Sequence, residues 1–432
     1  MVSNRDTEWD TVDWFDLGPD PDPASDRGQP HRWRWWAAMV VAMVAAALLL
    51  ARNQQGDQAP AGADQAAGGA RTIPASSGSA PAGRPVPESH SMPRGAGLSG
   101  SPLSGVPVGG AAAAGQSTVT TTDLGRPLLD VPDDWELFGQ GEGVVVRMEL
   151  GRGRITRTSM PVLGSASPIH FVVGQDRAIV HPMDWVPGYV VHDSKPATPL
   201  PPALSQAAST LPGPDPWHLW AETEAGTGSA LTLLTLDGRP AGVQIPIPPD
   251  ATVQASDRAG NVLLFGVGGM YDARPDGMHR ITSGTLLAVG PTHWLALECD
   301  ERYRCAGAVI DRDSGARRAL TTPMDSYEQN AGAVSPDGRM AALLQPNGVR
   351  GSNVHLLDLA TGADRVTGVR TRSHQTQGGR ALVWSPDSRW LFVTDGDGQV
   401  LAVDRAGRSV VLDARVGRLD QLALRTAHPL KR

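Results

Sequence analysis

The chain has 432 residues, of which 40% are hydrophobic, 5% aromatic and 19% charged. Its net charge of −7 and isoelectric point near 5.9 argue against the basic face that nucleic-acid binding needs. Two cysteines exclude a disulfide-rich scaffold and cysteine-rich zinc or iron–sulfur sites. The 50 glycines and 36 prolines are about a fifth of the chain, against a usual share of roughly 12%, and predict many turns and linkers.

Residues 1–32 predict an acidic, disordered, cytoplasmic tail. They contain eight acidic residues, no helical or strand period, and three prolines between positions 19 and 23 that prevent a regular element. Such a segment cannot bury enough apolar surface to offset the entropy of ordering. Two interpretations stay open: a solvated leader, or a docking motif in which Trp9, Trp14 and Phe15 stand among aspartates.

Residues 33–51 predict a single transmembrane helix. The stretch from Ala37 to Ala51 has no charged residue, and the whole segment spans about 28 Å at about 1.5 Å per residue, close to the hydrocarbon thickness of a bilayer. Tryptophans at its start match the aromatic belt of a membrane interface. Arginines cluster before the segment, which places the N-terminus in the cytoplasm and the rest of the chain outside. A cleaved signal peptide and a buried core helix are the alternatives.

Residues 52–126 predict a disordered linker. From Asn53 to Ser117 the chain is almost all Ala, Gly, Pro, Ser and Gln, without an aromatic residue. This composition cannot offset its ordering entropy. As a flexible coil the segment spans about 45 Å, so we expect a tether that lifts the following domain off the membrane.

Residues 127–432 predict a repeat array. The clearest unit, residues 380–412, alternates four short apolar runs with turns, and Ser385-Pro-Asp-Ser-Arg389 joins its first two runs. Ser335-Pro-Asp-Gly-Arg339 holds the same place in the preceding unit. In both turns proline presets φ and aspartate caps the turn. Five weaker units precede these two, at about 43 residues per unit, which is the spacing of four-stranded propeller blades.

These two turn motifs resemble the repeat of TolB-like and WD40-like (PD40-type) β-propellers. The resemblance implies an all-β propeller of four-stranded blades. The seven units counted along the chain predict seven blades, within a range of six to eight. A Gly-His…Trp-Asp pattern is absent from the sequence, so a regular WD40 array is not expected. The layout of acidic head, anchor, linker and propeller resembles uncharacterised anchored propellers of high-GC actinobacteria, a resemblance that implies no particular substrate.

The C-terminal run Leu419–Leu424 is expected to close the ring. The first unit offers only three good strands, and this run aligns with the innermost strands of the last two units. A propeller that leaves a strand edge open risks aggregation. We therefore expect the run to pair beside Trp135–Phe138, with a frayed tail as the alternative.

Motifs for cofactors and metals are missing from the sequence. It has no zinc-protease, phosphate-loop or serine-hydrolase signature. Gly139–Gly143 and Asp395–Gly398 read as hairpin turns rather than nucleotide or calcium loops. His170, His181 and His192 fall on three different strands of one unit and are not expected to bind a metal. No cofactor is predicted.

Cys299 and Cys305 predict a disulfide. They flank five residues at the tip between the second and third strands of one unit. Facing residues at the base of an antiparallel hairpin lie within disulfide reach, and such a pair oxidises outside the cytoplasm. Two free thiols are the alternative.

One face of the propeller is the candidate ligand site. Loops between second and third strands, and loops between blades, emerge on the same face, where rigidly held polar and aromatic residues serve binding. Solvated loop tips explain the same residues, so both interpretations stay open. The candidates are Trp185, Asp300, Glu301, Arg302, Tyr303, Arg304, Tyr327, Glu328, Asp395 and Asp397.

The sequence favours a non-catalytic binding or scaffold module, anchored in the membrane and displayed outside it. Its expected partners are the lipid bilayer and an unknown protein or cell-envelope polymer. The alternative is a propeller-based extracellular hydrolase or lyase, which needs carboxylates that converge on the central channel. The predicted inner strands carry almost no acids, which favours the binding module. These strands are Ile169–Val173, Leu286–Val289, Ala331–Val334 and Ala381–Trp384.

Overall fold

The computed structural model describes residues 116–161, 169–183, 186–226, 228–257, 259–324, 326–348, 351–372 and 381–426. Every described residue belongs to one unit, residues 104–432. The predicted tail, transmembrane segment and most of the predicted linker lie outside the described residues. In the part that is described, no helix has the length and hydrophobicity to cross a bilayer.

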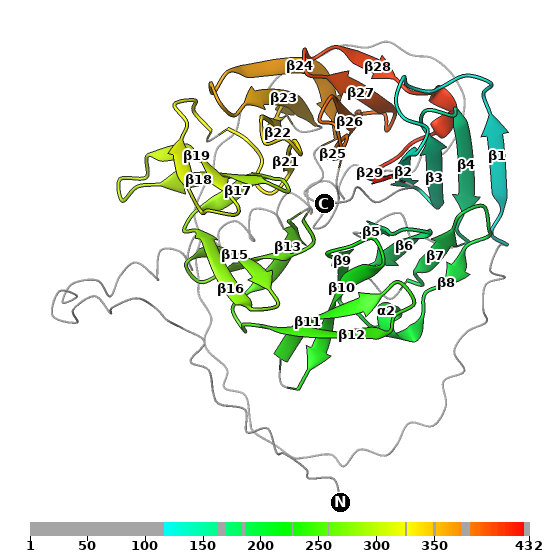
Figure 1. Ribbon diagram of the computed structural model, residues 1–432, viewed down its shortest axis with the longest axis horizontal. Coiled ribbons are helices and arrows are strands. Elements are labelled where there is room, and N and C mark those ends of the chain that lie inside the picture. The colour runs from blue at the N-terminus through cyan, green and yellow to red at the C-terminus, as the bar shows by residue number, and fades with distance from the viewer. Residues whose placement is uncertain are drawn as a thin grey trace, which may run out of the picture. The chain divides into compact units, whose positions relative to one another are not determined.

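The described residues form a ring of four-stranded antiparallel meanders (Figure 1). Each meander begins at its inner strand and proceeds outward, apart from the one that holds both ends of the ring. Four sheets consist of one meander each. Their strands are β5 (Ile169–Val173), β6 (Arg177–Pro182), β7 (Tyr189–His192) and β8 (Thr198–Pro199); β9 (Ser209–Pro212), β10 (His218–Ala225), β11 (Gly228–Thr235) and β12 (Pro240–Ile247); β13 (Thr252–Ser256), β14 (Val262–Gly266), β15 (Gly269–Arg274) and β16 (Gly277–Thr282); and β25 (Leu382–Trp384), β26 (Trp390–Thr394), β27 (Val400–Asp404) and β28 (Ser409–Val411).

Two further meanders share one eight-stranded sheet. They are joined by a short parallel pairing between their inner strands, Ala288 with Gly332 and Val289 with Ala333. A Cβ on Gly332 would lie 2.6 Å from the carbonyl oxygen of Leu287, so only glycine lets the two backbones come this close. The strands are β17 (Thr285–Val289), β18 (His293–Cys299), β19 (Cys305–Asp311) and β20 (Arg317–Ala319), followed by β21 (Gly332–Val334), β22 (Met340–Pro346), β23 (Ser352–Asp358) and β24 (Asp364–Thr371).

The remaining sheet, the closing sheet, joins the two ends of the ring. It consists of β1 (Val119–Asp123), β4 (Arg154–Ser159), β3 (Val144–Glu149), β2 (Trp135–Gly141) and β29 (Gln421–Thr426), in that order from outside to inside. Strand β29 pairs antiparallel with β2, from Trp135 opposite Thr426 to Gln140 opposite Gln421. The predicted closure is confirmed, although the strand starts two residues later than the run that predicted it.

Two sequence expectations need correction. The sequence predicted seven blades, within a range of six to eight. The hydrogen bonds instead divide the described strands into five single-blade sheets and one eight-stranded sheet, because the close approach at Gly332 lets two meanders pair. Strand β1 lies inside residues 52–126, which the sequence predicted as linker. It pairs antiparallel with β4, and the hydroxyl groups of Thr121 and Thr156 are hydrogen-bonded at 3.2 Å. The four inner strands named from the sequence are confirmed as β5, β17, β21 and β25.

The Ser-Pro-Asp turns adopt the geometry that their sequence predicts. The Ser335 hydroxyl donates to Asp337 Oδ1 at 2.7 Å and accepts the backbone N–H of Met340 at 3.0 Å. Ser385, Asp387 and Trp390 repeat both bonds at 2.6 and 2.9 Å. Gly338 has a φ of +69°, the left-handed position that glycine adopts without strain. These bonds fix each inner strand to the second strand of its own meander.

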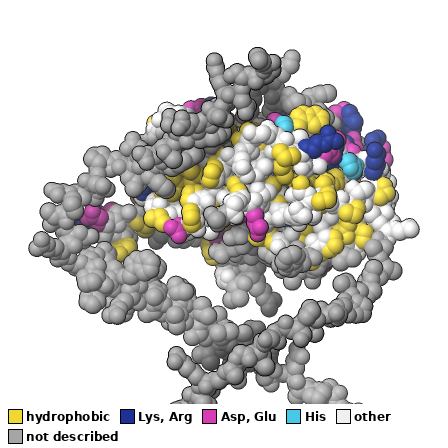
Figure 2. Space-filling view, turned by 90° about the horizontal axis from the view of Figure 1, so that it is seen from below, with side chains coloured by type: hydrophobic (Ala, Val, Ile, Leu, Met, Phe, Trp, Pro, Cys, Tyr) yellow, Lys and Arg dark blue, Asp and Glu magenta, His cyan; other side chains and the backbone are white. Residues whose placement is uncertain are grey.

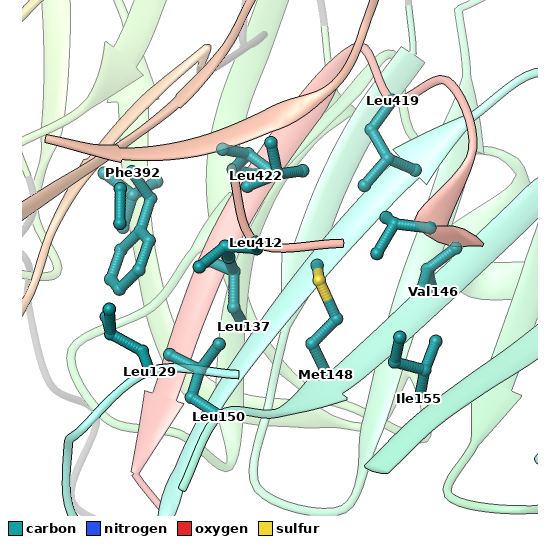
Figure 3. Close-up of a cluster of buried hydrophobic side chains, with 14 of the residues drawn as sticks. Leu129, Leu137, Val146, Met148, Leu150, Ile155, Phe392, Leu412, Leu419 and Leu422 are labelled. Carbon is teal, nitrogen blue, oxygen red and sulfur yellow. The ribbon is translucent and has the colours of Figure 1, made fainter. Parts of the chain in front are cut away.

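The hydrophobic core lies between neighbouring sheets. In β5, Phe171 packs with Phe138 of the closing sheet, whereas Val172 packs with Leu219 of the next sheet. Alternate residues of a strand therefore serve two interfaces. Figure 3 shows the interface that the closing sheet makes with the β25–β28 sheet. Its labelled residues are Leu129, Leu137, Val146, Met148, Leu150, Ile155, Phe392, Leu412, Leu419 and Leu422.

Short helical turns lie between some sheets. Helix α2 (Pro202–Ser205) precedes β9 and buries Leu204 in the interface between the β5–β8 and β9–β12 sheets. The 3₁₀ turn η2 (Ala414–Val416) precedes β29, with Asp413 as its N-cap. Neighbouring inner strands contact one another from β25 through β29, β5 and β9 to β13, and from β17 to β21 and β25; β15 contacts β17 and completes the ring.

Candidate functional site

The hairpin tip between β18 and β19, on the predicted ligand face, is held by a disulfide and by the hydrogen bonds of one carboxylate. Cys299 and Cys305 face each other across the two strands and form the predicted disulfide. The Asp300 carboxylate accepts the backbone N–H groups of Arg302 and Arg304, both at 2.9 Å, and the Arg304 guanidinium at 2.6 Å. These bonds, those to Arg304 above all, lower the pKa of Asp300. The tip is therefore a self-contained turn that displays Tyr303, which is 74% exposed.

Tyr327 and Glu328, two of the predicted ligand-face residues, are buried rather than exposed to solvent. They are only 7% and 5% exposed. The Tyr327 hydroxyl donates to Asp364 Oδ2 at 2.6 Å, and the Glu328 carboxylate accepts the Ser352 hydroxyl. Burial, with the Asp364 carboxylate beside it, raises the pKa of Tyr327. Both residues join the loop before β21 to the outer strands of the same meander.

Asp395 and Asp397 form a hairpin turn, as the sequence predicts. The Asp395 carboxylate accepts the backbone N–H of Asp397 at 2.9 Å and that of Gln399 at 2.8 Å. No hydrogen bond or ion pair between described residues joins this turn to the tip at Asp300. Trp185 lies outside the described residues. The predicted candidates are therefore separate loops within the described chain, and they do not converge on one cavity.

A cavity of about 390 Å³ lies at the mouth of the axial channel, where the inner strands end. It is bounded by β5, β9, β21, β25 and β29 and by the turns that follow the inner strands. Its walls include Phe171, Trp384 and Leu422. Proline recurs in the turns, and because it has no N–H it leaves few donors at the rim. The rim prolines are Pro212, Pro214, Pro216, Pro291, Pro336 and Pro386.

One turn gives this mouth a carboxylate and an imidazole. Asp215 and His218 are joined by a 2.8 Å contact between the carboxylate and Nδ1. Asp215 also accepts the backbone N–H of Trp217 at 2.8 Å; Trp217 is 54% exposed and is not among the described residues that line the cavity. Asp215 is the only carboxylate among the described residues that line the mouth. A pair of carboxylates, the requirement for acid–base cleavage of a glycosidic bond, is not found among those residues.

A buried ion cluster holds one side of the mouth. Asp257 accepts the backbone N–H groups of Ala259 and Asn261, both at 2.8 Å, and the Arg312 guanidinium, which comes from the neighbouring meander. Burial, with the nearby Asp257 charge, raises the pKa of Asp272, and hydrogen bonding to Arg274 opposes this rise. Ala259 and Gly260 line the cavity, and Gly260 O also accepts the Trp220 indole N–H at 2.6 Å. The wall is thus fixed before any ligand arrives.

No motif identified from the sequence marks this mouth. The signal in the sequence is a proline two residues after the end of an inner strand, as in the Ser-Pro-Asp turns. These prolines are Pro214, Pro291, Pro336 and Pro386. Only the ring closure brings those turns together. The prolines of separate repeats become one rim because the inner strands end at the same opening of the channel.

No family model and no curated protein matches the chain. Among solved structures it is similar to a protein of unknown function from Desulfotomaculum acetoxidans, at 11% identity and a TM-score of 0.42, covering 67% of this chain and 98% of that one. TolB from Acinetobacter baumannii is similar at 13% identity and a TM-score of 0.35, covering 68% and 67%. A puromycin-hydrolyzing peptidase from Mycobacterium tuberculosis is similar at 16% identity and a TM-score of 0.42, covering 69% and 55%.

These likenesses are distant and carry no argument about activity. The strand order and the closure of the ring by β29 rest on this chain's own hydrogen bonds. They identify the described part of the chain as an all-β propeller of four-stranded blades.

Proposed function

We propose that the chain is a non-catalytic binding module that holds an extended segment of a protein or cell-envelope polymer at the mouth of its channel. The observation that carries the proposal is the mouth itself, a cavity of about 390 Å³ with a proline rim and walls that include Phe171 and Trp384. Aromatic and proline surfaces bind extended chains with little loss of side-chain entropy. The inner strands hold the rim rigidly, so little ordering is needed on binding.

The test is capture of envelope material by the purified full chain in detergent. Protein and polymer fractions of a cell-envelope extract are passed over the wild-type chain, a His218→Ala variant and a His279→Ala variant. Each histidine pairs with the aspartate three residues before it, but His218 lines the mouth and His279 belongs to β16, so His279 is a matched control. We expect His218→Ala to reduce capture about tenfold or more, and His279→Ala to leave it unchanged. The reverse result contradicts binding at the mouth.

Propeller-based hydrolysis or elimination is the second candidate. One observation favours it: Asp215 orients the His218 imidazole at 2.8 Å, the arrangement of a general base. A captured polymer incubated with the wild-type chain is analysed for shorter products. Products that disappear in a His218→Gln variant would make the protein an enzyme and contradict the non-catalytic proposal.

We propose further that a single helix at residues 33–51 anchors the chain, with the N-terminus in the cytoplasm and the propeller outside. The uncharged apolar stretch and the arginines before it support this, and so does the Cys299–Cys305 disulfide, which suits an oxidising compartment. Engineered cysteines at Ser3 and at the exposed Gln116 are treated with an impermeant thiol reagent in intact cells. Labelling at 116 and protection at 3 are expected, and the reverse pattern refutes the topology.

A further inference from the structure

Two buried histidines lie side by side in the β5–β8 sheet. His170 on β5 and His181 on β6 are direct partners across the two strands. Their rings stack with centroids 6.1 Å apart and an interplanar angle of 26°. The residues are only 3% and 4% exposed, yet neither ring nitrogen of His170 and not the Nδ1 of His181 has a hydrogen-bond partner.

Such groups normally find partners. Nearly all buried polar atoms in folded proteins are hydrogen-bonded, because a lost partner leaves the desolvation of the group uncompensated. Burial lowers the pKa of both imidazoles, to about 4 for His170. Each ring is therefore neutral near neutral pH and offers one N–H donor and one lone-pair acceptor.

The histidines belong to the side of the sheet that faces the β9–β12 sheet. Residues alternate along a strand, and in β5 it is Val172 that packs with Leu219 of that neighbour. His170, two residues before Val172, lies on the same side, and so does His181, two residues after Ile179. Thr210 of β9, which is 1% exposed, likewise has a hydroxyl without a partner.

A cavity of about 1020 Å³ opens between these two sheets, and His181 is part of its wall. Thr223 of β10 and Thr232 of β11 line the opposite wall, with their hydroxyls 2.8 Å apart. Pro182 and Met183 add apolar surface. Helix α2 forms a further part of the lining through Ala203 and Ser205. This volume is that of a small-molecule pocket.

The charges of the wall restrict the ligand. The described residues that line the cavity include two carboxylates, Glu222 and Glu224, and neither lysine nor arginine. Figure 2 shows the side of the ring on which the β9–β12 sheet lies, and few charged side chains are visible over its middle. An anion would have no counter-charge here. A metal ion would need more ligands, because the described residues contain no group of three or more histidine, cysteine, aspartate or glutamate side chains able to hold one.

We propose that this cavity binds a small polyhydroxylated ligand of the carbohydrate class that carries no negative charge, with His181 in direct contact. A hydroxyl group can donate or accept a hydrogen bond, so it suits the neutral His181 imidazole, whose Nδ1 has no partner. The threonine hydroxyls of the opposite wall bond further hydroxyls, and the proline and methionine surface covers the apolar face of a sugar ring. This site is separate from the channel mouth, since the two cavities have no lining residue in common.

The experiment is titration of the purified full chain with neutral sugars, glucose and N-acetylglucosamine, followed by calorimetry and by the imidazole proton signals in NMR spectra. Glucuronate tests whether a negatively charged sugar binds, and Zn²⁺ tests whether the site is a metal site. We expect saturable binding of at least one neutral sugar below about 50 mM, as befits a weak small ligand. His181→Gln and Thr232→Val should each weaken it about tenfold or more.

Matched controls make the result decisive. Thr121 and Thr156 form the same kind of cross-strand threonine pair in the closing sheet, so Thr156→Val should leave sugar binding unchanged. His218→Ala, which tests the channel mouth, should leave it unchanged as well. The proposal is overturned by the absence of saturable binding of either sugar, by equal binding of glucuronate, by Zn²⁺ binding that depends on His181, or by equal loss in the Thr156→Val or His218→Ala variant.

Discussion

Arg425 lies in the last strand of the ring, yet its guanidinium contacts groups from three other segments. It donates to Glu136 of β2 at 2.6 Å and to Asp193, after β7, at 2.7 Å. It also donates to the carbonyl of Gly174 at 3.1 Å and lies 4.6 Å from the centroid of the Phe138 ring. Its side chain is 6% exposed and that of Glu136 is 7% exposed, so water does not screen the pair.

Replacement of this arginine is expected to be costly. Arg425→Met keeps much of the apolar stem but leaves the buried Glu136 with one cation fewer, which should lower the free energy of unfolding by about 3 kcal/mol. Denaturant unfolding of the purified variant measures this loss. Arg408→Met is the control, because that side chain is 83% exposed in its pair with Asp404 and should contribute less than about 1 kcal/mol. Equal losses in the two variants would contradict the argument.

His170 should make stability depend on pH in a defined window. Burial first, and the neighbouring His181 second, lower its pKa to about 4, whereas an unfolded histidine has a pKa of about 6.5. As the pH falls, the unfolded chain takes up the proton first. Stability is therefore complete above about pH 6.5 and declines toward pH 4, by about 3 kcal/mol for this group.

Denaturant unfolding at about pH 7, 5.5 and 4.5 checks this expectation. A His170→Phe variant, which keeps a ring in the core, should have a shallower loss between these values. His181, whose pKa is also lowered by burial, contributes in the same direction and remains in the variant. An unchanged pH dependence would show that His170 is not buried as a neutral ring.

The sequence predicted the structural role of some residues correctly and of others incorrectly. The Cys299–Cys305 pair was predictable because its six-residue separation across one hairpin is local. Tyr327 and Glu328 were not, since a polar residue in a loop between blades reads as exposed until its partners are known. Those partners, Asp364 and Ser352, lie on outer strands 37 and 24 residues further along the chain.

At the scale of elements, the β18–β19 hairpin has two devices that hold its tip: the disulfide and the hydrogen bonds of Asp300. Closing so short a loop removes little chain entropy, so a Cys299→Ser/Cys305→Ser variant should lose at most about 2 kcal/mol of stability. The Asp300 bonds should keep the turn in place. The β26–β27 hairpin is a natural comparison, because Asp395 makes the same backbone bonds there without a disulfide.

Hydrogen exchange measures this expectation directly. In the wild-type chain the backbone amides of residues 300–304 should exchange more slowly than those of residues 395–399. In the double serine variant the two turns should become similar. A tip that exchanges at the same rate with and without the disulfide would assign its order to Asp300 alone.

The elements that the sequence missed are those with weak local patterns. The Ser-Pro-Asp turns marked the strands around them, because proline, aspartate and glycine each favour one backbone conformation. Strand β1 has three consecutive threonines and no apolar alternation, so it reads as linker. It is a strand only because β4 offers it an edge. Strand β9 was also missed, because it has only four residues and a proline-rich turn follows it directly.

At the scale of the whole molecule, ring closure by β29 should decide whether the protein folds. A chain that stops after Gly417 lacks β29, Leu419 and Leu422, which leaves the edge of β2 open and removes part of the core beside it. We expect insoluble expression or a fall in melting temperature of more than about 10 °C. A chain that stops after Thr426 keeps all the pairs with β2 and should melt like the full chain. Equal melting of the chain that stops after Gly417 would refute the closure.

The closure of the ring by β29 also affects the order in which the domain folds during synthesis. The chain leaves the ribosome from its N-terminus, so β2 is made early, whereas Arg425 follows its partner Glu136 by 289 residues. A contact of such long range is among the last to form. A product of interrupted translation would carry nearly every blade and still expose an unsatisfied strand edge to proteases. The survival of the ring therefore depends on synthesis that proceeds through β29.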